Sequence, residues 1–288
     1  VQASGKFENI LLPVNRGGSN LFVNSLLEDT TRQCIWIGME GYLFQYNPTT
    51  GEMKAIEVFH NNSIKSLALD GDENLLAGTD NGLYVYQNDK EPLQHIIHDS
   101  RNIQSLTNNI IWNIFSDQEH NIWLGTDYGI SLSRYNSALQ FVPISQITGT
   151  GDGNQFYSLF RDSKGFYWFG GTNGVIRFTH PAGNKHDAIW YRMGDKNHPL
   201  SHNRIRHIYE DREQQLWIAT DGSINRYDYN THQFVHYNIV DSTGTYNTNW
   251  AYYLFEDTDG KLWIATCLGG IFVAVSYTHL RAHETLSD

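Results

Sequence analysis

The chain has 288 residues, of which 40% are hydrophobic and 18% charged, and its formal net charge is −11. That composition is sufficient for one large folded domain, and the acidic balance argues against a nucleic-acid partner, because phosphates bind to a basic surface. No apolar run reaches about 18 residues, so no membrane-spanning segment is expected. The first residues also lack the charged and apolar pattern of a signal peptide.

The first element expected in chain order is a short strand over residues 6–13. Its sequence, KFENILLP, resembles the segments 139–143 and 233–237, which end later repeat units. Because it precedes the first complete unit, we interpret it as the outer strand of a preceding or closing unit.

A repeat built on an Asp, a short polar turn and a Trp or Leu fills most of the remaining chain. Successive Trp or Leu positions are 40 to 49 residues apart, a period that indicates a repeat architecture. The pairs in chain order are Asp29 and Trp36, Asp70 and Leu76, Asp117 and Trp123, Asp162 and Trp168, Asp211 and Trp217, and Asp257 and Trp263. The first pair is one residue further apart than the others.

Each unit contains short β-rich runs separated by turn residues, with no helical periodicity. In the fifth unit the predicted strands are 205–210, 216–220, 224–229 and 233–237. Four strands per repeat at this period are typical of a propeller blade. We therefore predict an all-β fold, a β-propeller of six four-stranded blades within residues 1–275. The blade cores are predicted near 23–58, 64–98, 110–143, 155–192, 204–237 and 250–273.

Two arrangements of the ring are open at this point. Either the strand over 6–13 completes the last blade and closes a six-bladed ring, or the chain is a slice of a larger, seven-bladed one. Closure matters because an open sheet edge invites mispairing.

The repeated residues have a structural interpretation. The Asp carboxylate is expected to accept hydrogen bonds from turn amides, with Gly165 and Gly260 at positive φ, and the Trp is expected to pack between blades. An Asn eight residues before the Asp is interpreted as a cap on the loop entering each blade. These residues are Asn62, Asn109, Asn154, Asn203 and Asn249.

The positions just after this Asn vary between units, and variation on a fixed frame is where binding specificity can reside. They include Ser63, Lys65, Ile110 and Gln155. Aromatic faces stack on sugar rings, while guanidinium and amide groups bind hydroxyls or a carboxylate. We therefore predict ligand-binding residues at the channel mouth, with one more aromatic residue in a turn on the same face. The set is Trp112, Tyr128, Tyr157, Arg204, Arg206, Trp250 and Tyr252. The alternative for each residue is packing of the inner strands.

Catalytic motifs are absent from the sequence: it has no Gly-x-Ser-x-Gly, His-Glu-x-x-His, Cys-x-x-Cys or P-loop. Only His202 and His207 lie close to an inner strand, where a propeller lyase would need a base. We predict no catalytic residue, metal or cofactor.

Residues 276–288 break the repeat and are interpreted as a tail of non-native sequence. The two cysteines, Cys34 and Cys267, lie at different points of their units, so a disulfide between them is not expected.

The pattern Asn-x-Ile/Val-x-x-Ile-x-x-Asp-x-x-Gly-x-Leu-Trp-Ile-Gly-Thr resembles the two-component regulator propeller repeat. Residues 203–220 and 109–130 match it best, whereas Leu75-Leu76 departs from it. The resemblance implies a periplasmic sensor region of a Bacteroidetes hybrid two-component system, in which two seven-bladed propellers precede a β-sandwich, a membrane helix and a kinase. It carries over no ligand-binding residue.

By resemblance we expect a sensing module that binds an oligosaccharide and forms a homodimer in its parent protein. Two other functions are considered: a protein-interaction propeller without a small ligand, and a propeller lyase or hydrolase.

Overall fold

Each repeat unit folds into its own antiparallel sheet. The computed structural model describes residues 10–13, 22–56, 59, 62–87, 90–135, 141–143, 154–179, 188–197, 199–241, 248–267, 269–274 and 281–282. The first three sheets contain β1 (Val23–Asp29), β2 (Cys34–Met39), β3 (Leu43–Tyr46) and β4 (Met53–Ile56); β5 (Ile64–Leu69), β6 (Leu75–Thr79), β7 (Gly82–Gln87) and β8 (Lys90–Ile96); and β9 (Ile111–Ser116), β10 (Ile122–Thr126), β11 (Gly129–Ser133) and β12 (Phe141–Pro143).

The next two sheets have the same strand order. They contain β13 (Phe156–Arg161), β14 (Tyr167–Gly171), β15 (Gly174–Phe178) and β16 (Ile189–Tyr191), then β17 (Ile205–Glu210), β18 (Leu216–Thr220), β19 (Ile224–Asp228) and β20 (Gln233–Tyr237). The sixth contains β22 (Ala251–Glu256), β23 (Leu262–Thr266) and β24 (Ile271–Ala274), with β25 (Arg281–Ala282) and β21 (Val240–Asp241) at its outer edge. The predicted propeller blades are therefore confirmed, and the fifth differs from prediction by one residue.

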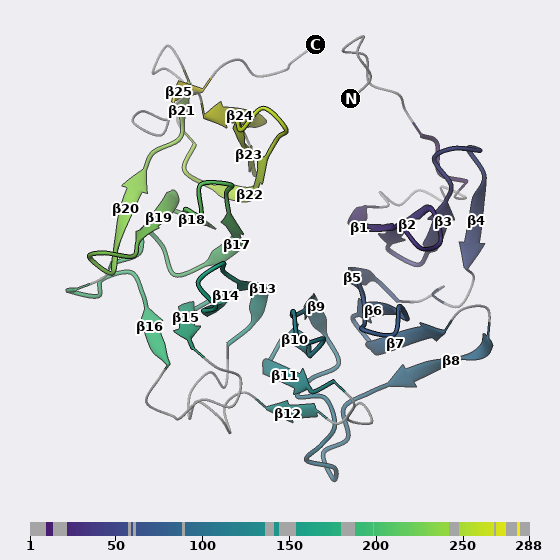
Figure 1. Ribbon diagram of the computed structural model, residues 1–288. Coiled ribbons are helices and arrows are strands. Elements are labelled where there is room, and N and C mark those ends of the chain that lie inside the picture. Colours follow the sequence, from purple (N-terminus) through teal and green to yellow (C-terminus); the bar gives the residue numbers. More distant parts are fainter. Residues whose placement is uncertain are drawn as a thin grey trace.

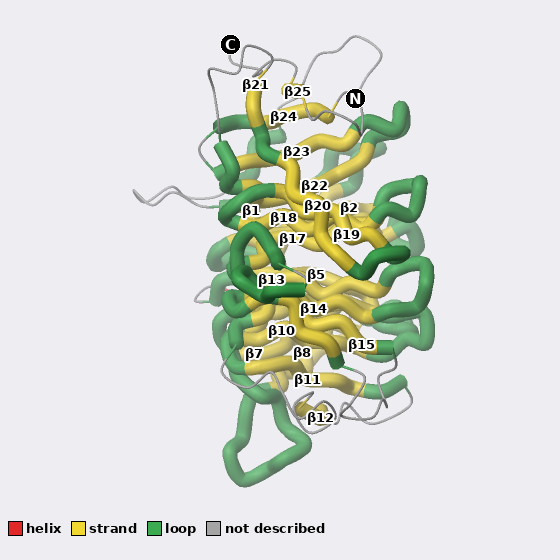
Figure 2. The backbone as a smooth tube through the Cα atoms, turned by 90° about the vertical axis from the view of Figure 1, so that its left-hand side faces the viewer, coloured by secondary structure: helices red, strands yellow, loops and turns green. Residues whose placement is uncertain are grey.

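The six sheets are arranged as blades around a centre (Figure 1). The first strand of each blade is innermost, and each contacts the next around the ring: β1 with β5, then β9, β13, β17 and β22. Figure 2 shows the strands as a central layer with loops on both of its faces. The turns between second and third strands lie on the face where the chain enters each inner strand.

The repeated Asp and Trp form a hydrogen-bonded pair as well as a turn and an anchor. Trp217 is fully buried, and its indole Nε1 donates to Oδ2 of Asp211 at 2.7 Å. Oδ1 of Asp211 accepts the amide of Gln215 at 2.8 Å. The same indole bond joins Asp29 to Trp36, Asp117 to Trp123, Asp162 to Trp168 and Asp257 to Trp263. Gly165 and Gly260 have the expected positive φ, 87° and 80°.

Small residues in the second strands let neighbouring blades approach closely. A Cβ built on Gly38 would lie 2.6 Å from Cγ2 of Ile64 in the next blade, and one on Gly78 would lie 2.7 Å from Cγ2 of Ile111. A Cβ on Gly170 would overlap with Ile205. Because real Cβ contacts are wider than this, only glycine fits while the facing residue keeps its place.

We expect Gly170→Ala to lower the free energy of unfolding by about 1–3 kcal/mol, the usual cost of overpacking a core. Adding Ile205→Ala should relieve the overlap and reproduce the pairing of Ala219 with Ala251, which share the next buried cluster. Urea unfolding of wild type, both single variants and the double variant would measure the coupling. If the losses of unfolding free energy from Gly170→Ala and Ile205→Ala simply added in the double variant, the close approach of these two residues would be contradicted.

The ring is open between the first and sixth blades in the described part of the chain (Figure 1). The strand predicted over 6–13 is not observed at residues 10–13; Leu12 instead packs beside Ile37, Met39 and Phe44, and residues 6–9 lie outside the described residues. In the described part of this segment, Leu12 thus supplies a packing contact with the first blade. In the sixth blade, β25 pairs with β24. Most of the 276–288 tail is likewise outside the described residues.

Both cysteines are free: Cys34 is buried and Cys267 exposed. A search of the described residues found no helix with the length and apolar character of a membrane span.

Candidate functional site

Every inner strand contains a β-bulge at its second residue. In β17, for example, Ile205 pairs with Thr220 and His207 with Ala219, which leaves Arg206 without a partner across the ladder. The bulged residues of the six blades are Asn24, Lys65, Trp112, Tyr157, Arg206 and Tyr252. A bulge re-aims a side chain, and bulges are common beside functional sites.

Three pairs of consecutive bulged residues contact each other across the blades. Nζ of Lys65 lies 4.6 Å from the centre of the Trp112 ring, and the Trp112 and Tyr157 rings meet edge to face at 5.4 Å. The Arg206 guanidinium lies 5.1 Å from the Tyr252 ring. We name the six bulged residues and the polar groups bonded to them the inner rim.

One half of the inner rim is held by hydrogen bonds from neighbouring turns. Nε1 of Trp112 and Nε2 of Gln155 both donate to Oδ1 of Asp127, at 3.0 and 2.6 Å. The Tyr157 hydroxyl in turn donates to Oε1 of Gln155. Burial raises the pKa of Tyr157, while the charges of nearby arginines oppose that shift, so its hydroxyl stays protonated at neutral pH.

The other half is organised around Arg206. Its guanidinium makes a bidentate contact with Asp221, at 2.6 and 3.1 Å, and lies over the Trp250 and Tyr252 rings. Burial lowers the pKa of Arg206, but the hydrogen bonds and charge of Asp221 outweigh burial and place it above its usual value. Trp250 and Tyr252 are 36% and 51% exposed, so they offer ring surface to a ligand.

Two predicted residues are less well integrated. Arg204 lies close enough to Tyr157 for its charge to act on the hydroxyl, but within the described residues its guanidinium has no hydrogen bond or ion pair. Tyr128 is 54% exposed in the turn between β10 and β11, where its backbone amide donates to Thr126. The structure thus brings together Trp112, Tyr157, Arg206, Trp250 and Tyr252, with Arg204 beside them and Tyr128 apart.

Sequence reasoning did not select Lys65, Asp127, Gln155 or Asp221 as site residues. The bulge always falls three residues after the repeated Asn, so that register alone would have added Lys65 to the predicted set. Asp127 and Asp221 lie in the turns between second and third strands, where Asp is a common turn residue. Asp127 and Asp221 belong to the rim because they accept hydrogen bonds from Trp112 and Arg206, side chains of the inner strands.

Three of the repeated Asn residues, Asn109, Asn203 and Asn249, cap the entry loops as predicted, whereas Asn62 donates to the Tyr84 hydroxyl and Asn154 accepts from Thr172 and Asn173. Oδ1 of Asn109 accepts the amide of His98, and Oδ1 of Asn203 accepts the amide of Met193. Their backbone carbonyls accept an amide of the preceding blade, for example Gly82 to Asn109 at 2.7 Å.

The two histidines near inner strands already have hydrogen-bond partners. Nδ1 of His202 accepts the amide of Arg204, and Nδ1 of His207 accepts the amide of Leu254 at 3.2 Å. His207 also stacks on Tyr253, with ring centres 3.9 Å apart. Burial lowers the pKa of His207 to about 4.

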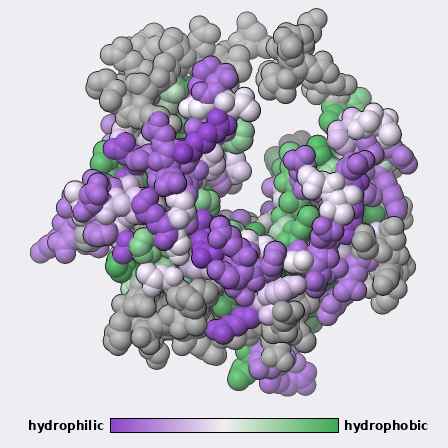
Figure 3. All heavy atoms as spheres, viewed as in Figure 1, coloured by the Kyte–Doolittle hydropathy of each residue, from purple (hydrophilic) through white to green (hydrophobic). Residues whose placement is uncertain are grey.

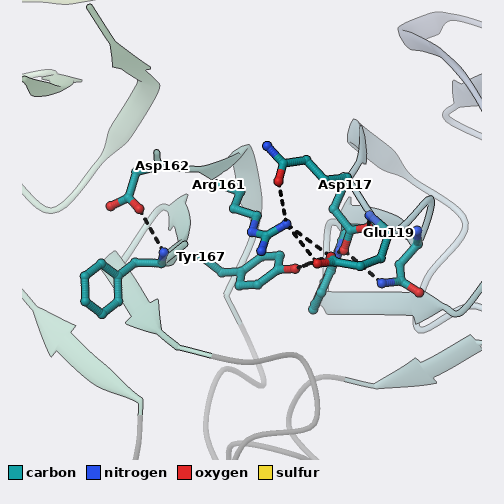
Figure 4. Close-up of polar contacts among 9 residues, drawn as sticks. Asp117, Glu119, Arg161, Asp162 and Tyr167 are labelled. Atoms are coloured by element: carbon teal, nitrogen blue, oxygen red, sulfur yellow. Dashed lines mark hydrogen bonds and ion pairs between the residues drawn. The ribbon is translucent and has the colours of Figure 1, made fainter. Parts of the chain in front are cut away.

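The opposite face is built from polar links between hairpins. Figure 4 shows Arg161 and Tyr167 of the fourth blade reaching Asp117 and Glu119 of the third. Arg161 lies 3.1 Å from a Glu119 oxygen, and the Tyr167 hydroxyl donates to Asp117 at 3.1 Å. Burial first, and then the charge of Asp117, raise the pKa of Tyr167 well above its usual range, which keeps it a donor.

A cavity of about 410 Å³ lies on this opposite face, between the hairpin turns of the fifth blade and Lys164. The Tyr227 and Tyr229 side chains form part of its wall, but both hydroxyls are already engaged, with Arg177 and with Asp162. The described residues contain no group of three or more potential metal ligands. The convergent aromatic and polar groups are therefore those of the inner rim.

Comparison with known families identifies the repeat. The model of the two component regulator propeller matches residues 105–128, 150–173, 199–222 and 245–267. A comparison with curated proteins gave no match.

Among solved structures, one described as the extracellular domain of a hybrid two component system, BT4673 from B. thetaiotaomicron, is 78% identical, with a TM-score of 0.48. The match covers all of this chain and 40% of that one, so the present chain spans less than half the length of that relative.

More distant structures share the fold. The corresponding domain of BT3049 from B. thetaiotaomicron is 19% identical, with a TM-score of 0.70 over 88% of this chain and 34% of that one. Virginiamycin B lyase from Staphylococcus aureus is 14% identical, with a TM-score of 0.67 over 92% of this chain and 85% of that one. At these identities the similarity concerns fold alone.

Proposed function

This chain belongs to the two-component regulator propeller family, and we propose that it is the ligand-sensing propeller of a hybrid two-component regulator, acting in the periplasm. The relative that is 78% identical over the whole chain is described as an extracellular domain of such a system. The kinase that would receive the signal is not in this chain. We further propose that the parent protein signals as a homodimer.

The ligand we propose is an oligosaccharide bound at the inner rim. The observation that carries this proposal is the contact between bulged residues of different blades, from Lys65 through Trp112 to Tyr157 and from Arg206 to Tyr252. Trp250 and Tyr252 have exposed ring surface for stacking on sugar C–H faces. Gln155, Asp127 and Arg206 are fixed by their neighbours, so little order has to be imposed on them when hydroxyls bind.

The test is calorimetric titration of the full chain with a panel of defined plant and host oligosaccharides. We expect one saturable binder, and we expect Trp112→Ala, Arg206→Ala and Tyr252→Ala each to weaken it by about tenfold or more, as for central contact residues. Circular dichroism and thermal unfolding of each variant would confirm that it is folded. Tyr135→Ala, at a 41% exposed residue outside the rim, is the matched control.

The free cysteines provide a second readout of the same site. Cys267 is exposed, and its amide donates to the carbonyl of Trp250 at 3.1 Å, whereas Cys34 is buried. A ligand on the sixth-blade side of the rim should slow alkylation of Cys267 and leave Cys34 unchanged. Normal binding by the rim variants would show that the site lies elsewhere. No binder from a folded sample would favour a protein partner.

A further inference from the structure

The contact between two successive blades, which we call a seam, uses the same strand positions around the ring. In the seam between the fourth and fifth blades, Ile205 and Ile208, the first and fourth residues of β17, are buried against Trp168. Oγ of Ser158, the third residue of β13, accepts the amide of Ile208 at 3.0 Å, and Phe160, the fifth, packs on the same cluster. A seam therefore joins residues three and five of one inner strand to residues one and four of the next.

The open sides of the ring expose the two complementary halves of such a seam. In the sixth blade, Tyr253 and Phe255 are the third and fifth residues of β22, and they are 53% and 54% exposed. In the first blade, Val23 and Leu26 are the first and fourth residues of β1, and they are 48% and 65% exposed. The equivalents of Val23 and Leu26 in the other five blades are all buried, which shows how unusual this exposure is. They are Ile64 and Leu67, Ile111 and Ile114, Phe156 and Leu159, Ile205 and Ile208, and Ala251 and Leu254.

The polar part of a seam is also divided between the two open sides. In the seam between the fourth and fifth blades, the amide and hydroxyl of Ser163 donate to the Glu210 carboxylate, both at 2.9 Å. By register, the equivalent of Ser163 in the sixth blade is Thr258, and the equivalent of Glu210 in the first blade is Glu28. Both are exposed. The Thr258 hydroxyl of one open side can therefore donate to the Glu28 carboxylate of the other, as Ser163 donates to Glu210 inside the ring.

We infer that these two faces bind each other between two copies of this chain. The open face of the sixth blade, with Tyr253, Phe255 and Thr258, packs on the open face of the first blade of another copy, with Val23, Leu26 and Glu28. Within one chain the two faces stand apart across the opening, where hydrophobic atoms are visible (Figure 3). Burying exposed aromatic and aliphatic side chains supplies the driving force.

The resulting contact is heterologous, because the two surfaces differ, so each copy can bind one neighbour on each side. A further repeat in a longer chain would compete for the same faces, and the inference therefore concerns the 288-residue chain. It does not depend on the identity of any ligand.

The test is the molar mass of the 288-residue chain by light scattering as a function of concentration. The wild type should rise above the mass of one chain as its concentration increases. Phe255→Glu destroys one face and Leu26→Glu the other, so each variant alone should stay at the mass of one chain. An equimolar mixture should reach the mass of two chains, because one intact face of each kind remains. Ile103→Glu, at a 79% exposed residue outside both faces, should associate like the wild type.

Other outcomes would overturn the inference. A wild type that is monomeric at all concentrations would show that the faces do not bind. Association that persists in both variants, or a mixture that stays monomeric, would exclude the head-to-tail contact. Thermal unfolding of each variant shows whether it is folded. Because Leu26 and Phe255 are both exposed, we expect both variants to fold.

Discussion

Replacing Asp211 by alanine should lower the free energy of unfolding by about 3–5 kcal/mol, because two donors lose a carboxylate acceptor and each buried donor left unsatisfied costs about 1–3 kcal/mol. Asp211 is only 4% exposed and accepts both the Trp217 indole at 2.7 Å and the Gln215 amide at 2.8 Å. Alanine would leave the buried Trp217 indole and the partly buried Gln215 amide without this acceptor. Urea unfolding followed by tryptophan fluorescence would measure the loss.

The second blade contains a natural control for this prediction. Its Asp70 is followed by Leu76 rather than Trp, and Oδ2 of Asp70 instead accepts the side-chain amide of Asn74 at 2.9 Å. Asp70→Ala removes the turn acceptor but leaves no buried indole without a partner, so we expect a loss of about 1–2 kcal/mol. Equal losses at the two positions would show that the indole bond adds nothing to stability.

Acidification should weaken the seam between the fifth and sixth blades through His207. Its pKa is lowered from 6.5 to about 4 by burial, and Nδ1 accepts an amide, so the folded state holds the neutral ring. Above pH 6.5 the imidazole is neutral in both states, and its contribution is unchanged. Between pH 6.5 and about 4 the unfolded chain binds a proton that the folded chain does not, so stability falls as pH falls. The total loss is at most about 3 kcal/mol, since one pKa unit corresponds to about 1.36 kcal/mol.

The matched variant is His207→Ser, because in other seams a serine hydroxyl accepts the equivalent amide. Ser25, Ser66 and Ser158 each accept an amide of the next inner strand. Serine has no titratable group in this range. We expect the difference in unfolding free energy between wild type and His207→Ser to shift by up to about 3 kcal/mol between pH 7 and pH 4, in favour of the variant. Carboxylates titrate in both proteins and cancel in this difference. A constant difference would mean that His207 protonates normally in the folded chain.

The amino-acid sequence was sufficient to predict the blades because their determinants are local. The Asp, its turn amides and the Trp lie within seven residues in most repeats, and the strand pairs on either side are joined by tight turns. The Asp was predicted as a turn acceptor and the Trp as an anchor. Their direct bond was not predicted, although both residues were identified.

The inner rim was predicted in part for the same reason. The register after the repeated Asn placed Trp112, Tyr157, Arg206 and Tyr252 at one point of each blade. Which of these residues meet, and through which partners, depends on the bulges and on neighbouring turns. Asp127 bonds to Trp112 from 15 residues away and to Gln155 from 28, and no pattern in the sequence indicated those bonds.

The sequence by itself thus determined the repeat, the strands and the positions that vary, because hydrophobic period and turn chemistry act over a few residues. Only the tertiary structure decided what depends on contacts between blades, such as the amide of Ile114 donating to Ser66 across 48 residues. Those contacts assembled the inner rim with Lys65 and Asp221, left Tyr128 apart and placed Leu12, from the strand expected over residues 6–13, in a packing contact with the first blade. They also placed two complementary faces on the open side of the ring. The physical reason is that side-chain packing between sheets has no fixed spacing along the chain.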